Sequence, residues 1–154
     1  MRILVLALSL LSFLLLRPVL ADDQLLSKLE PLTIATPDDA KLFTVEIADT
    51  DGLRARGLMF RQRLPEDRGM LFDFGHPREA AMWMKNTYIP LDMLFIRQDG
   101  TIAYIAENTV PKSEDVIGVR EPVLAVLELA GGVTRKLGIR SGDRVYHRIF
   151  KDAD

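Results

Sequence analysis

The chain has 154 residues, with 20 basic and 22 acidic side chains and no cysteine. The near balance of charges argues against a nucleic-acid surface, and the missing cysteine excludes a disulfide framework, a thiol nucleophile and every cysteine-based metal site. We therefore expect an ordinary soluble protein that is stabilised by packing alone.

The first segment has the pattern of a secretory signal peptide. Arg2 supplies the positive start, residues 3–16 form an apolar core, and Val19-Leu20-Ala21 has the small residues of a cleavage site. The sequence therefore predicts a signal peptide over residues 1–21, export to the periplasm, and no stable membrane insertion after cleavage. An uncleaved anchor is the alternative, although an apolar core of about 14 residues is short for ~30 Å of hydrocarbon.

The next segment, residues 22–41, is polar and contains Pro31 and Pro37. It is predicted to be a flexible leader that contributes at most one edge strand, Leu32 to Thr36. Residues 42–151 are long enough for one hydrophobic core and are expected to form a single domain.

The start of that domain has two clear local patterns. Residues 43–48 alternate between apolar and polar side chains, which predicts a half-buried strand with Phe43 facing the core. Thr50 or Asp51 can then cap a short helix through Arg56, which Gly57 ends.

The rest of the chain is dominated by short strand patterns. Residues 69–74 should form a strand with Met70, Phe72 and Phe74 on one face, and Gly75-His76-Pro77 should break it. The further expected elements are strands at 80–84, 91–98, 101–108, 123–129 and 144–150, a helix at 131–137 and a tight turn at Asp99-Gly100. This order predicts a mainly β fold, a jelly-roll-like β-sandwich or squashed barrel with one or two short helices.

A polar cluster stands between two apolar, strand-like runs. Buried polar groups cost free energy unless they are hydrogen-bonded, so these side chains require a structural or chemical reason. Two aromatic residues flank the cluster and could offer ring faces to a sugar or another small ligand. The predicted ligand-binding residues are Lys85, Asn86, Thr87, Asp92, Trp83 and Tyr88.

Several separated motifs resemble the DUF192 (UPF0127) family. They are Arg56-Gly57-Leu58-Met59, Gly69-Met70-Leu71-Phe72, Trp83-Met84-Lys85-Asn86-Thr87 with Ile89-Pro90-Leu91-Asp92, and Leu137-Gly138-Ile139 with Gly142-Asp143. The resemblance implies a mainly β, jelly-roll-like domain and frequent export, and it implies no catalytic residues.

The hairpin turn suggests a pair of carboxylates. A two-residue turn at Asp99-Gly100 would place Phe95 opposite Tyr104 and Asp92 opposite Glu107, with Lys85 as the nearby cation. Such a pair is the candidate catalytic machinery of a small hydrolase. Alternatively, Asp92 caps its own loop through the amides of Asn86 or Thr87 while Glu107 is solvated, or a bulge near Gly100 separates the pair.

A third possibility is a Cu(I) site made by Met82, Met84 and His76, although methionine is also the usual filler of irregular cores. The sequence contains no nucleophile elbow, zinc-binding helix motif or phosphate-binding glycine loop. We therefore expect a binding or accessory module without cofactor or metal, whose partner is a small molecule or an envelope component. Its oligomeric state stays open.

Overall fold

The computed structural model describes residues 27–150, so the expected signal peptide lies outside the described residues. Its elements are β1 (Leu29–Ala35), β2 (Ala40–Ala48), α1 (Asp51–Arg56), β3 (Arg68–Met82), β4 (Leu91–Ile96), β5 (Ile102–Ala106), β6 (Ile117–Ala130), α2 (Val133–Leu137) and β7 (Arg144–Tyr146). The fold is mainly β with two short helices, as the sequence predicts. In this part of the chain no helix has the length and apolar character needed to span a membrane.

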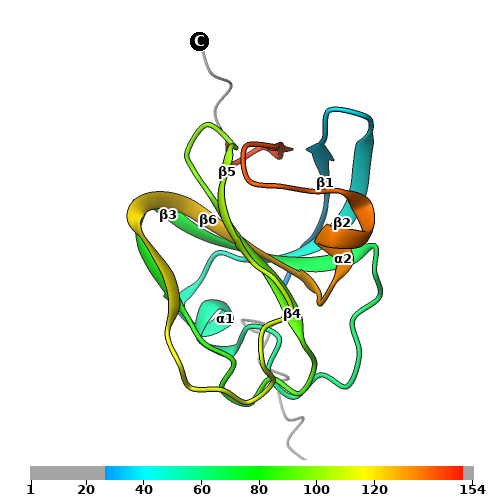
Figure 1. The fold of residues 1–154 in the computed structure, drawn as a ribbon. Coiled ribbons are helices and arrows are strands. Elements are labelled where there is room, and N and C mark those ends of the chain that lie inside the picture. The colour runs from blue at the N-terminus through cyan, green and yellow to red at the C-terminus, as the bar shows by residue number, and fades with distance from the viewer. Residues whose placement is uncertain (1–26, 151–154) are drawn as a thin grey trace, which may run out of the picture.

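The strands form one strongly curled sheet in the order β5-β4-β6-β3-β2-β1-β7. Every neighbouring pair is antiparallel except β2 and β3, which are parallel. The two edges meet, because Thr101 bridges Arg144 and the Ile102 amide donates to the Asp143 carbonyl at 2.9 Å. The two edges therefore approach each other at this end, which gives the curled half-barrel seen in Figure 1.

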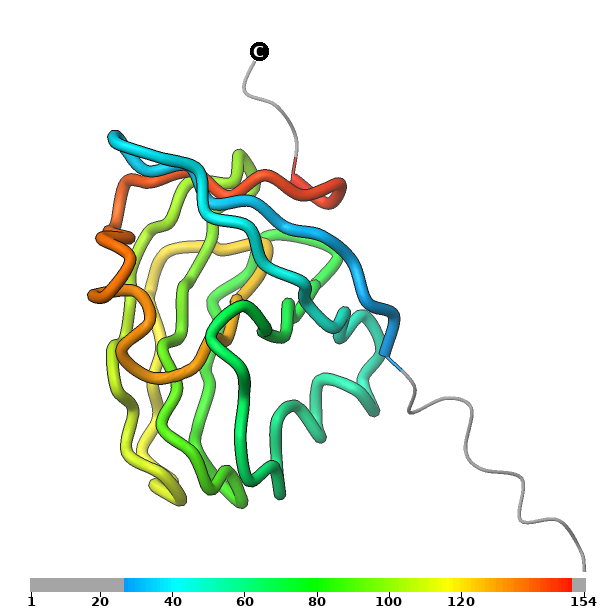
Figure 2. Tube along the Cα trace, turned by 90° about the vertical axis from the view of Figure 1, so that its right-hand side faces the viewer, coloured from blue at the N-terminus to red at the C-terminus, as the bar shows by residue number. Residues whose placement is uncertain are grey.

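Each face of the sheet carries its own hydrophobic core. We call the first the inner core; it contains Leu32, Ile34, Leu94 and Leu127, and Val133 of α2 packs into it. The second, the outer core, has Phe72, Met93 and Val126 from the strands and Leu53 from α1. Figures 1 and 2 show α1 and α2 on different sides of the curled sheet. Successive residues of a strand therefore contribute to different cores.

The structure differs from the expected flexible leader between residues 29 and 41. β1 pairs along its length with β2 and also with β7, and Leu32 and Ile34 are 1% and 0% exposed. Pro31 lies within β1, and Pro37 lies in the turn between β1 and β2. The two prolines therefore do not prevent a strand from forming. The alternation that places Leu32 and Ile34 on the buried face indicated a strand more strongly than the prolines indicated a flexible segment.

The patterns around β2 and α1 predicted the local structure correctly. The hydroxyl of Thr50 accepts a hydrogen bond from the Leu53 amide at 3.2 Å, and Gly57 ends α1 with a φ of 48°. The strand expected at 69–74 and the one expected at 80–84 instead belong to a single bent strand, β3, whose pairing with β6 shifts register after Asp73.

The β4–β5 hairpin has the predicted register for a different reason. Its turn has three residues, because the Arg97 amide donates to the Thr101 carbonyl and Gly100 has a φ of 85°. This turn shifts the pairing by one residue, and a second irregularity next to Phe95 shifts it back. The predicted pairing of Phe95 with Tyr104 is therefore confirmed, although the predicted turn type was wrong.

Gly100 should be intolerant of any side chain. Its φ is positive, and a Cβ atom would collide with the backbone carbonyl oxygen of Val145, where the sheet edges meet. We expect Gly100→Ala to lower the free energy of unfolding by about 2 kcal/mol or more. Denaturant melts would measure this, with Gly52→Ala as the control, because the Cβ position of Gly52 in α1 is open. Equal melting of both variants would contradict this prediction.

Candidate functional site

The sheet divides the polar cluster that the sequence presents as one group. Along β4, Leu91 and Met93 contribute to the outer core, whereas the neighbouring Leu94 contributes to the inner core. Asp92 shares the inner face with Leu94 because side chains alternate along a strand. Lys85 and Thr87 lie at the outer face, so Asp92 is separated from them by the sheet.

Asp92 is 0% exposed and accepts four hydrogen bonds. The donors are the amides of Asn108 (2.8 Å), Gly132 (2.9 Å) and Thr134 (2.9 Å) and the hydroxyl of Thr134 (2.7 Å). The carboxylate therefore joins β4 to the end of the hairpin and to the first turn of α2. The alternative in which Asp92 caps its own loop through Asn86 or Thr87 was therefore wrong, although Asp92 has a structural role.

The carboxylates of Asp92 and Glu107 have separate partners. Glu107 forms an ion pair with Arg135 at 2.7 Å near the surface. The expected cation, Lys85, instead places its ammonium nitrogen 5.1 Å from the centre of the Trp83 ring. The arrangement needed for a two-carboxylate hydrolase, with one shared cation and open access to Asp92, is not formed.

A cavity of about 100 Å³ lies at the outer face, next to α1. Residues 54–59 form one wall and residues 81–83 form another, so Trp83 belongs to the cavity. Lys85 and Thr87 contribute from the loop after β3, and Phe72 and Glu128 contribute from the sheet. The cavity therefore collects three of the residues predicted to bind a ligand, without Asp92.

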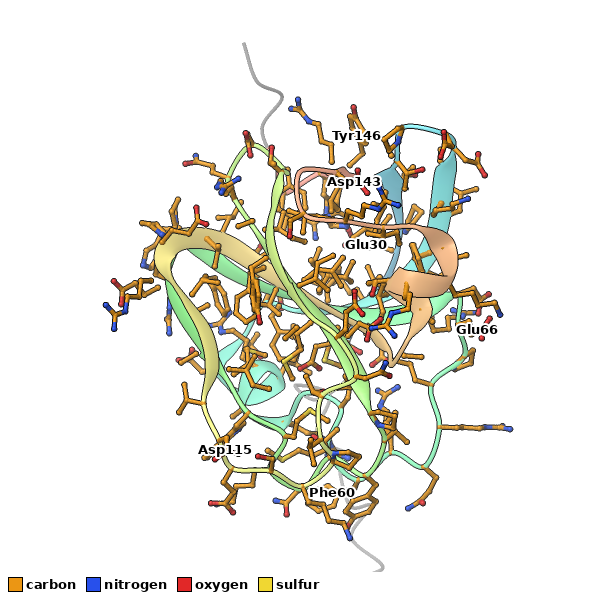
Figure 3. The ribbon with its side chains drawn as sticks, in the orientation of Figure 1. Glu30, Phe60, Glu66, Asp115, Asp143 and Tyr146 are labelled. Atoms are coloured by element: carbon orange, nitrogen blue, oxygen red, sulfur yellow. The ribbon has the colours of Figure 1, made fainter. Side chains whose placement is uncertain are left out.

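The loop after β3 is fastened to the segment that follows α1. Asn86 adopts a φ of 56°, and its carbonyl accepts a hydrogen bond from the Phe60 amide at 2.8 Å. The ring of Phe60 meets that of Tyr88 edge-on, with 6.0 Å between ring centres. Figure 3 shows Phe60 at the end of the molecule opposite Tyr146. Asn86 and Tyr88 thus hold the loop in place beside the cavity.

The cavity also contains Glu128, which was not among the site residues predicted from the sequence. It lies in β6 between Met70 of β3 and Met93 of β4, and it is 4% exposed. Burial raises the pKa of Glu128 to about 8, and no charge or hydrogen bond from the described residues offsets this effect. Burial therefore favours the neutral, protonated form of this side chain. The available signal was one acidic residue in the apolar run of residues 123–129.

The charges around the cavity are mostly positive. Arg54 is bound to the carboxylate of Asp51 at 2.6 Å and to the carbonyl of Asp73 at 2.7 Å. For Arg56 and Lys85, residues 27–150 provide no acidic partner within 4 Å. A neutral acid, an indole ring and unpaired cations thus line the same cavity.

The three residues considered for Cu(I) have different surroundings. The sulfur of Met84 is fully buried and accepts a hydrogen bond from the Thr109 hydroxyl at 3.1 Å. His76 lies in the exposed bend of β3, and Met82 lines the cavity. Of the three, only Met84 is a buried core residue, and their different surroundings do not support a shared Cu(I) site.

The model of the family DUF192, described as "Uncharacterized ACR", matches residues 33–147. The chain belongs to the DUF192 family. This DUF192 chain is similar to a crystal structure from Sinorhizobium meliloti 1021, described as a "putative transcription regulator", with 50% identity and a TM-score of 0.76 over 78% of this chain and 94% of that one. It is also similar to a protein of unknown function from Novosphingobium aromaticivorans DSM 12444, with 38% identity and a TM-score of 0.77 over 85% and 90% of the two chains. No curated protein matches the DUF192 chain.

Proposed function

We propose that this DUF192 protein is a small-ligand binding module and that its ligand occupies the cavity next to α1. The observation that carries the proposal is Glu128, a buried acid that lines the cavity without a hydrogen-bond partner among the described residues. Export, which rests on the N-terminal signal pattern, remains part of this proposal.

The energetic cost of Glu128 supports a binding role. Burial of the Glu128 side chain disfavours its ionised form, and an apolar residue at this position of β6 would avoid the cost of burying a carboxyl group. Buried acids with strongly raised pKa values cluster at functional sites. Glu128, the nearby cations and Trp83 bring polar groups and an aromatic ring together in one cavity, and such groups can orient a bound ligand.

Binding is favoured over the alternatives. Hydrolysis by Asp92 and Glu107 would require an accessible Asp92, whose oxygens are occupied by four donors. The regulator description belongs to the Sinorhizobium protein. The net charge of -2 of this chain disfavours binding to the phosphate backbone of DNA.

Trp83, the one tryptophan of the chain, gives a direct test because it lines the cavity and is 47% exposed. Panels of sugars, amino acids, organic acids and nucleotides would be titrated while Trp83 fluorescence and the melting temperature are recorded. We expect one class to change both signals, because a ligand that binds only the folded state raises its stability.

Two variants would localise the binding. Ala81→Phe fills the cavity from β3, whereas Ala40→Phe changes an exposed alanine at the start of β2. The response should disappear in the first variant and persist in the second. A response that persists in Ala81→Phe, or a panel without any response, would contradict the proposed function.

A further inference from the structure

We propose that the ligand is a small organic carboxylate, which accepts a hydrogen bond from the Glu128 carboxyl group while Arg56 and Lys85 balance its charge. This inference rests on the proposed function, because it assigns a chemical class to the ligand of the same cavity.

The protonation of Glu128 determines what can bind beside it. A neutral carboxyl group has one O–H to donate, and Glu128 has no acceptor for it among the described residues. A ligand carboxylate accepts such a proton in a short, charge-assisted hydrogen bond. A cationic ligand would require Glu128 to ionise, which its burial opposes.

The charged groups that line the cavity together with Glu128 favour an anion. Arg54 and Arg56 line the cavity from α1, and Lys85 lines it from the loop after β3. In the sheet, the residues paired with Glu128 are the uncharged Met70 and Met93. Glu128 is therefore the only acid in the described lining, and its burial favours the neutral form.

The remaining lining explains why a carboxylate with a hydrocarbon body fits better than inorganic phosphate. Leu58, Met59, Phe72, Met82 and Trp83 contribute apolar side chains to a lining that also contains polar and charged groups. Its volume is about 100 Å³, whereas one water molecule requires roughly 10 to 15 Å³ by the same kind of measure. The cavity thus suits a short-chain acid of a few carbon atoms.

Binding of this kind must be linked to the protonation of Glu128. Ionised Glu128 would repel the ligand carboxylate and lose its hydrogen-bond donor, so affinity should fall as the pH rises through about 8, the raised pKa of Glu128. Short carboxylic acids are already ionised above about pH 6, so the ligand itself does not titrate in this range.

The experiment compares butyrate with its neutral analogue butyramide by Trp83 fluorescence at about pH 6 and pH 9. We expect butyrate to bind the wild-type chain about tenfold more weakly at the higher pH, and butyramide to bind weakly at both. Glu128→Gln keeps a neutral donor, so its affinity for butyrate should not depend on pH. Glu107→Gln, which changes an acid outside the cavity, should retain the wild-type pH dependence.

A second variant, Arg56→Met, tests the proposal independently of any effect that Glu128→Gln has on folding. Arg56→Met should weaken butyrate binding and leave butyramide unchanged, because Arg56 is an exposed cation at the cavity. Equal binding of butyrate and butyramide, tighter binding of inorganic phosphate, or the same butyrate affinity at both pH values would overturn the carboxylate assignment. Each of these results leaves the proposed function standing, provided that Ala81→Phe removes the binding, whereas a wild-type chain that binds no small molecule overturns both.

Discussion

Asp92→Ala is expected to destabilise the domain by about 3 to 5 kcal/mol. The substitution removes one acceptor group but leaves the amides of Asn108, Gly132 and Thr134 without their partner. Asp92 also provides the side-chain cap of α2, because Gly132 at the N-cap position has no side-chain oxygen to offer. Loss of Asp92 should therefore loosen both α2 and the end of the hairpin.

Urea unfolding would measure this loss, and Glu107→Gln is the matched control. Glu107 forms an ion pair with Arg135, whose side chain is 75% exposed, and such pairs contribute about 1 kcal/mol or less. A similar cost for both variants would show that the four hydrogen bonds of Asp92 contribute no more than a surface ion pair. Where Asp92→Ala remains folded, butyrate binding should persist, since Asp92 lies on the other face of the sheet.

The sequence predicted best those elements that are determined by neighbouring residues alone. The alternation in β2 and the caps of α1 specify their elements without help from distant residues. β1 was underestimated because one of its partners, β7, lies at the far end of the described chain, and only the folded sheet places β1 between β2 and β7. The hairpin register was obtained through two shifts that cancel, and the second shift has no signal in the turn sequence.

The candidate site was predicted only in part for a related reason. Trp83, Lys85 and Thr87 stand together in the chain and line the cavity together. Asp92 is also close in sequence, but the alternation of β4 turns it to the inner face. Glu128 comes from β6, and its position beside α1 depends on the pairing of β6 with β3. That pairing joins residues that are far apart in sequence, so the residues near Lys85 contain no pattern that predicts it.

The stability of the protein should decrease strongly between about pH 5 and pH 8. The pKa of Glu128 is raised from 4.5 to about 8 in the folded state, so folding retains a proton that the unfolded chain has released. The stabilising effect of that proton is complete below the unfolded value and is lost as the pH rises through the folded value. Because one bound proton changes stability by more than about 1 kcal/mol per pH unit, the total over this range is roughly 3 to 4 kcal/mol.

Glu128→Gln separates this effect from every other titrating group. Denaturant melts of the wild type and the variant at several pH values should give a difference in unfolding free energy that grows in favour of the variant as the pH rises. Glu128→Leu should follow the same course and also be more stable at pH 8, because leucine avoids the buried polar group that β6 now contains between Met70 and Met93. Parallel pH profiles of wild type and Glu128→Gln would mean that the buried carboxyl ionises as readily in the folded chain as in the unfolded one. The proton required for hydrogen bonding to a carboxylate ligand would then be absent at pH 7.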